Sequence, residues 1–215
     1  MTVDILTGKC YPAFMAKYSD SKEKTLLAAA KLFCRQGYHG TALQDILAAS
    51  GAPRGSLYFH FPRGKEEIAE GAVAIGEKVV RGFIAHVAGT SRTAEAFVIN
   101  LARGMAANLE ASDFREGCPL ATTALEIATD SETIGKATRE AFAGWEREIE
   151  QALVRFGVDG KQAAAAATAI LSQVEGALLL ARTYRSLEPM RRAEEALRLL
   201  VKPNRGRRSG QSRRD

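Results

Sequence analysis

A short stretch, residues 53–56, combines side chains that are suited to binding a ligand. Arg54 carries a guanidinium that can donate two parallel hydrogen bonds to O6 and N7 of guanine. Gly55 has no side chain and would let the backbone approach a ligand closely, and the Ser56 hydroxyl can bind a phosphate or a base edge. This combination favours recognition of nucleic acid. An ordinary solvated charge at Arg54 is the alternative.

Catalysis and metal binding have much weaker candidates. Cys10, Cys34 and Cys118 are too few and too scattered for a disulfide framework or a zinc site, and the three histidines form no ligand cluster. Cys118 could act as a nucleophile, but the sequence places no histidine to activate it. We therefore expect no enzyme, no metal and no cofactor, and we expect Cys34 to be a core residue.

Helices must position residues 53–56, because apolar residues recur at three-to-four spacing and no strand pattern competes. The pattern predicts a helix over 21–36, a short helix capped by Thr41, a turn at 50–52, a second short helix over 53–61 and a long helix over 65–86. In a helix-turn-helix the second helix enters the major groove with its N-terminal residues toward the base edges.

The same segment matches a known family pattern in register: Thr41, Asp45-Ile46, Ala49, Gly51, Gly55-Ser56-Leu57-Tyr58-Phe59-His60-Phe61 and Lys65-Glu66. It resembles the DNA-binding domain of the TetR family of repressors. Ala42 departs from the pattern, since the family often has a second hydroxyl there. The break at 62–64 is one residue longer than usual, which resembles the LmrA-like branch.

The predicted DNA-binding residues combine both lines of reasoning. Arg54 is expected to read a base, and Lys65 at a helix N-terminus offers a charge to a phosphate. Tyr58 and His60 resemble the family's phosphate-contacting pair; in isolation they would be read as packed residues. The full set is Thr41, Gln44, Pro53, Arg54, Gly55, Ser56, Tyr58, His60 and Lys65.

Charge is uneven along the chain. Residues 1–65 carry nine Lys/Arg against four Asp/Glu, residues 66–202 sixteen against twenty, and residues 203–215 five against one. A basic N-terminal module on a mildly acidic body suggests a polyanion-binding part attached to a part with another role. We expect a disordered arm over 1–20, a DNA-binding domain over 21–67, a helical domain over 68–202 and a disordered basic tail over 203–215.

The helical domain is expected to bind a small molecule, as the resemblance implies. Gly117-Cys118-Pro119-Leu120 and residues 175–183 also resemble the LmrA-like branch. Candidate pocket residues are Phe97, Leu101, Met105, Cys118, Phe142, Trp145 and Ile149. Residue by residue, ordinary core packing is the simpler interpretation, but a helical body can enclose a cavity between its helices.

The last two predicted helices, over 159–186 and 189–202, look like a hairpin. A helix that is apolar on more than one face is usually buried on two sides, against its own domain and against a partner subunit. In the TetR family the last two helices build a dimer interface. Candidate interface residues are Leu171, Val174, Leu178, Ala181, Met190 and Leu197.

The sequence thus predicts an all-α, cytoplasmic homodimer that binds a palindromic operator in double-stranded DNA and dissociates when a small apolar or aromatic effector binds. No apolar run approaches the roughly 20 residues that span a bilayer, so no membrane partner is expected. A non-regulatory architectural DNA-binding protein is the alternative function. It would show neither sequence preference nor release by a ligand.

Overall fold

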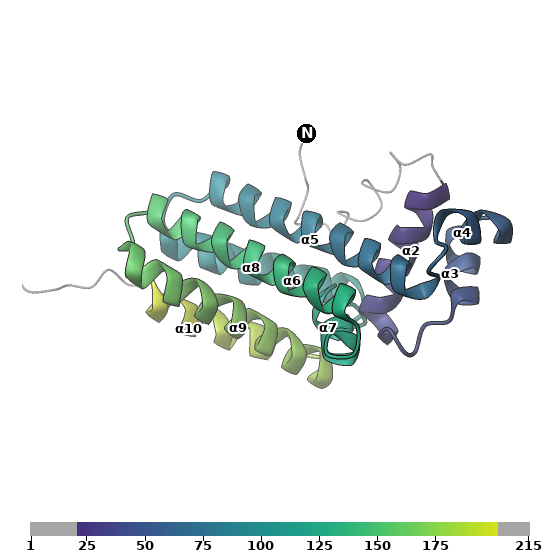
Figure 1. Cartoon of the computed structure of the whole chain (residues 1–215). Coiled ribbons are helices and arrows are strands. Elements are labelled where there is room, and N and C mark those ends of the chain that lie inside the picture. Colours follow the sequence, from purple (N-terminus) through teal and green to yellow (C-terminus); the bar gives the residue numbers. More distant parts are fainter. Residues whose placement is uncertain (1–20, 202–215) are drawn as a thin grey trace, which may run out of the picture.

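The computed structural model describes residues 21–201, and within that range the chain forms nine helices and no strand. The expected all-α class is confirmed. The arm at 1–20 and the tail at 203–215 lie outside the described residues. The helices are α2 (Ser21–Gln36), α3 (Leu43–Ser50), α4 (Arg54–His60), α5 (Lys65–Thr90), α6 (Ala94–Ala111), α7 (Ala121–Ile127), α8 (Glu132–Arg155), α9 (Gly160–Tyr184) and α10 (Glu188–Leu200) (Figure 1).

Helices α2, α3 and α4 form one end of the molecule, which we call the head (Figure 1). Leu57 and Phe61 are four residues apart, so both point to the same side of α4, where each is only 1% exposed. They pack with Phe33, Ile46 and Ile68 in a small core of the head. Burying each such side chain contributes about 1.5–3 kcal/mol, so these anchors hold α4 in place.

The turn between α3 and α4 depends on Gly51. This residue adopts φ +65°, a left-handed conformation that favours glycine, and its N–H donates to the Leu47 carbonyl at 3.0 Å. Pro53 stands just before α4 rather than inside it, so that helix begins one residue later than expected. The N-cap of α3 is Ala42, not Thr41, and its N–H donates to the Asp45 carboxylate at 2.9 Å.

Helix α5 continues from the head into the remaining helices, which we call the body. Its 26 residues span about 39 Å at 1.5 Å per residue, and it ends at Thr90 rather than near His86. It packs along α8 (Figure 1). Near its start, the Glu66 carboxylate accepts hydrogen bonds from Ser131 and Thr133 at the beginning of α8, and these bonds lower the pKa of Glu66. The proposed domain boundary after residue 67 therefore lies inside a continuous helix.

The body has a larger core, built around Phe97, Trp145, Leu153 and Ile170, each at most 1% exposed. Helices α9 and α10 form the expected hairpin. By length and composition alone α9 could cross a membrane, which corrects the expectation that no segment is long and apolar enough. Only 33% of its most apolar window is buried in the body, so α9 is apolar on its outer face as well.

Candidate nucleic-acid interface

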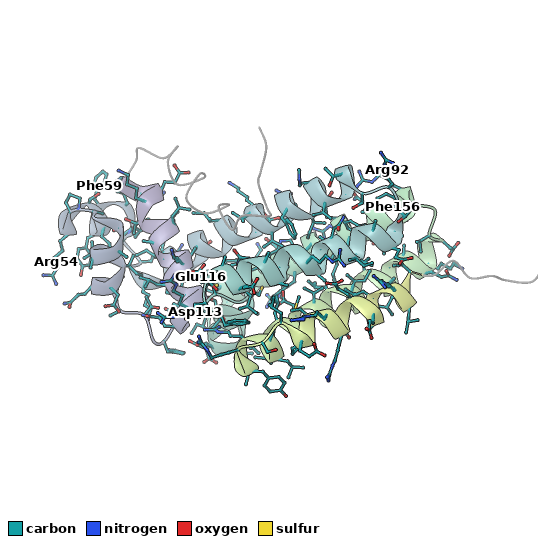
Figure 2. The ribbon with its side chains drawn as sticks, turned by 180° about the vertical axis from the view of Figure 1, so that it is seen from behind. Arg54, Phe59, Arg92, Asp113, Glu116 and Phe156 are labelled. Atoms are coloured by element: carbon teal, nitrogen blue, oxygen red, sulfur yellow. The ribbon has the colours of Figure 1, made fainter. Side chains whose placement is uncertain are left out.

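The exposed side of α4 lies at the outer end of the head. Arg54 and Phe59 both lie at that end, far from Arg92 and Phe156 at the other end of the body (Figure 2). Arg54 is the first residue of α4, it is exposed, and no ion pair in residues 21–201 engages it. A Cβ placed on Gly55 would meet nothing within 4 Å. The first turn of α4 is therefore open to a large partner on both its side-chain and its backbone surface.

The second turn of α4 adds aromatic groups to this surface. Tyr58 is 57% exposed and Phe59 81% exposed, while the half-buried His60 ring packs edge-on against Phe59, with ring centroids 5.1 Å apart. Sequence reasoning missed Phe59. Its position four residues after Gly55, on the same side of α4, was the available signal.

Two predicted contacts have hydroxyl groups that are engaged within the head. Thr41 is fully buried, and its hydroxyl donates to the Gly37 carbonyl at 2.7 Å, so it holds the α2–α3 turn and cannot reach DNA in this conformation. The Ser56 hydroxyl shares a 2.6 Å hydrogen bond with the Ser21 hydroxyl and so faces α2. A hydroxyl residue at or near the start of a short helix satisfied the sequence pattern in both cases, but each hydroxyl hydrogen-bonds within the head.

The remaining predicted contacts flank α4. Gln44 and Pro53 are exposed. Lys65 is half-buried, and its ammonium lies 4.3 Å from the centroid of the Tyr38 ring, a cation–π contact. Burial lowers the pKa of Lys65. The structure thus leaves Gln44, Pro53, Arg54, Gly55 and Tyr58 exposed on the head, with Lys65 and His60 partly covered.

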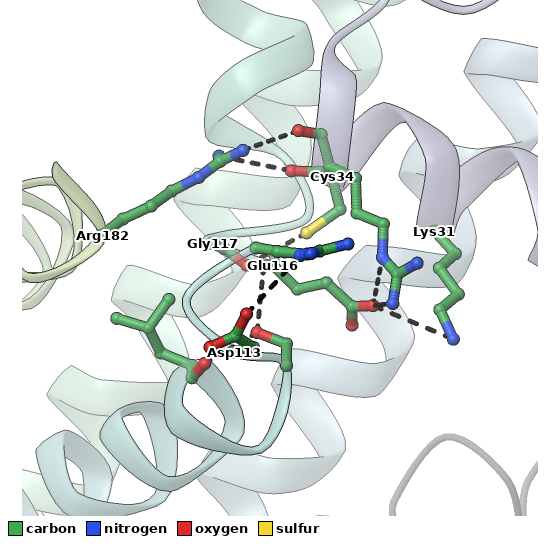
Figure 3. A network of polar contacts seen from close by, with 10 residues as sticks. Lys31, Cys34, Asp113, Glu116, Gly117 and Arg182 are labelled. Atoms are coloured by element: carbon green, nitrogen blue, oxygen red, sulfur yellow. Dashed lines mark hydrogen bonds and ion pairs between the residues drawn. The ribbon is translucent and has the colours of Figure 1, made fainter. Parts of the chain in front are cut away.

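A polar network joins the head to the body (Figure 3). The Arg35 guanidinium donates to the Glu116 carboxylate at 2.6 and 2.7 Å, and the Lys31 ammonium lies 3.8 Å from the same oxygen. Glu116 is only 8% exposed, in the loop between α6 and α7. Arg182 of α9 donates to two backbone carbonyls of α2. We call this set the junction network. No local sequence signal reveals it, because its members lie in three distant segments.

The seven candidate pocket residues all belong to the body core. Five are buried, while Met105 and Phe142 are half-buried against them. The Phe142 and Trp145 rings meet edge-on at 5.3 Å, and the Trp145 indole N–H donates to the Glu77 carbonyl at 3.2 Å. Burial, then the Glu175 carboxyl, raises the pKa of the Cys118 thiol well above its ordinary value, and burial raises that of Cys34 to about 12. Both thiols stay protonated at neutral pH, which argues against a nucleophilic role.

The residues predicted for the dimer interface lie mostly inside the protomer. Val174, Leu178, Ala181, Met190 and Leu197 are at most 7% exposed and pack in the protomer's own core, with Leu171 half-buried against it. In this protomer the apolar stripe that carries the five buried residues faces the core, and only Leu171 is partly exposed. The exposed large apolar residues of the hairpin are Leu179, Leu180, Tyr184, Leu199 and Leu200, and we call the surface that carries them the outer face. A hollow of about 560 Å³ on this face is lined by Gly176, Leu180 and Pro189, among others.

Comparisons with known proteins match both parts of the chain. Residues 26–72 fit the model of bacterial regulatory proteins of the tetR family, and residues 94–196 fit that of the LmrA/YxaF-like C-terminal domain of transcriptional regulators. The HTH-type transcriptional regulator LmrA of Bacillus subtilis is 35% identical over 80% of this chain and 92% of its own length. YxaF of the same organism, an HTH-type transcriptional regulator, is 33% identical over 87% of this chain and 98% of its own.

Solved structures share the fold. A TetR transcriptional regulator from Legionella pneumophila superposes with a TM-score of 0.76 at 22% identity, covering 86% of this chain and all of that one. A cysteine mutant of the TetR family regulator CifR, solved with 26-bp operator DNA, superposes with a TM-score of 0.68 at 23% identity, covering 81% and 95%.

Proposed function

The chain belongs to the tetR family of bacterial regulatory proteins, and from this premise we propose that it is a homodimeric repressor that leaves a palindromic operator when a small effector binds its body. Its family and relatives are transcriptional regulators, not enzymes. We propose that it acts in the cytoplasm, where the chromosomal DNA lies. The observation that carries the proposal is the open first turn of α4.

Base reading is assigned to Arg54. Its guanidinium is exposed at the N-terminus of α4, the end that a helix-turn-helix directs toward base edges. Gly55 leaves space for close approach of the DNA, and Tyr58 at 57% exposure is free to reach a phosphate. Gln44, Pro53, His60 and Lys65 complete the proposed contact surface around α4.

The homodimer is assigned to the outer face of α9 and α10. Leu179 is 63% exposed, Tyr184 64% and Leu199 65%, which is unfavourable for large apolar side chains that face water. Pairing with the same face of a second copy would bury them on both subunits. An apolar α9 that packs inward on one side and against a partner on the other also explains its bilayer-like composition.

Binding of the effector, which would release the protein from DNA, is assigned to the body core around Phe142 and Trp145. An apolar or aromatic compound would have to displace side chains that are packed in this structure, and it favours release only by its difference in affinity between the two body conformations. Helix α5 runs from this region to the head and would carry the change to α4.

Selection of genomic DNA fragments by the full chain tests the proposal. We expect a palindrome whose half-sites are about 34–36 Å apart, or a multiple of that, because two heads must reach successive major grooves. Fragments without shared sequence, together with no release by any small molecule, would indicate an architectural DNA-binding protein instead. A monomer by sedimentation at micromolar concentration would contradict the two-headed mechanism.

A further inference from the structure

The C-terminus of α2 is capped by a side chain from the far end of the sequence. Arg182, in the last turn of α9, donates from Nη2 to the Arg35 carbonyl at 2.6 Å and from Nη1 to the Cys34 carbonyl at 3.4 Å. The last four carbonyls of a helix have no partner N–H in that helix, and the helix dipole favours a cation there. Figure 3 shows the guanidinium reaching both oxygens. One planar fork thus serves two backbone groups of the head.

The same turn of α2 is held through its side chains. Arg35 donates to the buried Glu116 carboxylate, and the Cys34 thiol donates to the Gly117 carbonyl at 3.2 Å. Together with Arg182, these contacts attach both the backbone and the side chains of the last turn of α2 to the body. The head therefore has a second connection to the body besides the continuous helix α5.

This second connection begins on the helix that carries the outer face. Tyr184, two residues after Arg182, is 64% exposed, and Leu179, three residues before it, is 63% exposed. All three belong to α9, a continuous 25-residue helix. Because a helix moves as a rigid element, the position of a dimer partner on Leu179 and Tyr184 also fixes where Arg182 holds α2.

We propose that Arg182 is a positioning residue for DNA recognition: it fixes the angle between the head and the outer face, and so the separation of the two Arg54 side chains in the dimer. This inference rests on the proposed function, since it needs a homodimer with two reading heads. Arg182 does not contact DNA in this scheme. It acts through the last turn of α2.

Operator spacing is the property to measure, because it depends on head separation and not on the contacts within one half-site. Inserting one base pair moves a half-site by about 3.4 Å along the duplex and rotates it around the axis. We expect the wild type to lose at least about tenfold in affinity for operators lengthened or shortened by one base pair. In Arg182→Ala that difference should fall to about twofold or less, while the base preference within each half-site stays unchanged.

Two further variants make the result decisive. Arg182→Lys keeps the charge but lacks the planar fork that spans two carbonyls, so it should relax the spacing requirement almost as far as alanine does. If the alanine variant fails to fold, the lysine variant provides the same measurement. Arg103→Ala is the matched control: it removes an arginine that pairs with Glu194 at 3.0 Å between α6 and α10, away from the junction network, and should keep the wild-type spacing profile.

Sedimentation and thermal denaturation first confirm that each variant is a folded dimer. A folded Arg182→Ala or Arg182→Lys dimer with the wild-type spacing profile would overturn the inference while leaving the proposed function intact. A wild-type chain that is monomeric, or that binds no paired half-sites, would instead contradict the proposed function.

Discussion

The head exposes its candidate binding groups to solvent, whereas the body buries its own in the core. In the head, Arg54, Tyr58 and Phe59 are exposed on a short helix anchored by the buried Leu57. In the body, the aromatic and sulfur groups are inside the core, and the exposed apolar side chains gather on the outer face. The head is therefore open to a large rigid partner, whereas the body would have to rearrange to take the proposed small molecule. Substitutions at exposed residues of the head should therefore change DNA affinity more than the stability of the fold.

The outer face provides the largest expected effect. Leu179→Asp would place an unpaired carboxylate from each subunit in the proposed dimer interface, costing about 3–5 kcal/mol of association free energy. Sedimentation should show a monomer at micromolar concentration, with operator binding lost and the protomer still folded, because Leu179 is 63% exposed. Leu125→Asp, at an 84% exposed position on α7, is the control and should leave the dimer intact. If Leu179→Asp remained a dimer, the dimer interface would have to lie on another surface.

Arg54→Ala tests whether the head reads sequence. Losing a bidentate contact to guanine should reduce discrimination between operator and unrelated DNA by about 1–3 kcal/mol, with the thermal midpoint unchanged. Titrations against both DNAs measure this difference. Arg63→Ala removes the same charge from a residue just before α5 that pairs with Glu70 at 2.7 Å, and should leave the discrimination between the two DNAs unchanged. Equal behaviour of the two variants would reduce Arg54 to a phosphate contact.

Gly55→Ala should separate stability from binding. A Cβ at this helical position meets nothing in the free protein, so alanine should stabilise the fold by up to about 1 kcal/mol. The same methyl group would stand where the DNA approaches, so operator affinity should fall. Thermal denaturation and DNA titration of one preparation give both values. An affinity at or above that of the wild type would show that the backbone of α4 stays away from the DNA.

Glu175→Gln tests how the stability of the body depends on pH, and it should have the smallest effect. Burial raises the pKa of Glu175, so the ionised carboxylate disfavours the folded state once the pH exceeds its ordinary value of 4.5. Glutamine should therefore raise the melting temperature at pH 7, and the gain should shrink as the pH falls toward 4, where the wild-type group is protonated. Glu140→Gln, at an exposed position, should show no such trend. The Glu175 carboxyl also forms a hydrogen bond with the Cys118 thiol, and a destabilised Glu175→Gln at pH 7 would mean that this bond outweighs the burial.

The sequence predicted the head better than the body. Leu57 and Phe61 at helical spacing, Gly51 at the turn and Arg54 after Pro53 are local signals, and they locate the helices and the exposed turn of α4. For the hairpin, periodicity identifies an apolar stripe without saying which side is covered within the protomer: Val174 and Leu178 face the core, and Leu179 faces outward.

Hydroxyl residues and long-range contacts explain the other misses. Thr41 and Ser56 fit a binding pattern, yet each hydroxyl hydrogen-bonds within the head, a choice decided by packing. The contacts between Arg182 and α2 join residues 147 and 148 positions apart in the chain, so only the folded structure brings them together.

Glu116 has a practical consequence for protein engineering. A chimeric regulator made by cutting within α5 and attaching a foreign head would keep this nearly buried carboxylate but lose Arg35, its ion-pair partner. An uncompensated buried charge costs about 3–5 kcal/mol, a large part of a typical domain's stability. A functional graft should therefore carry Lys31 and Arg35 with the new head, or replace Glu116 with an uncharged residue.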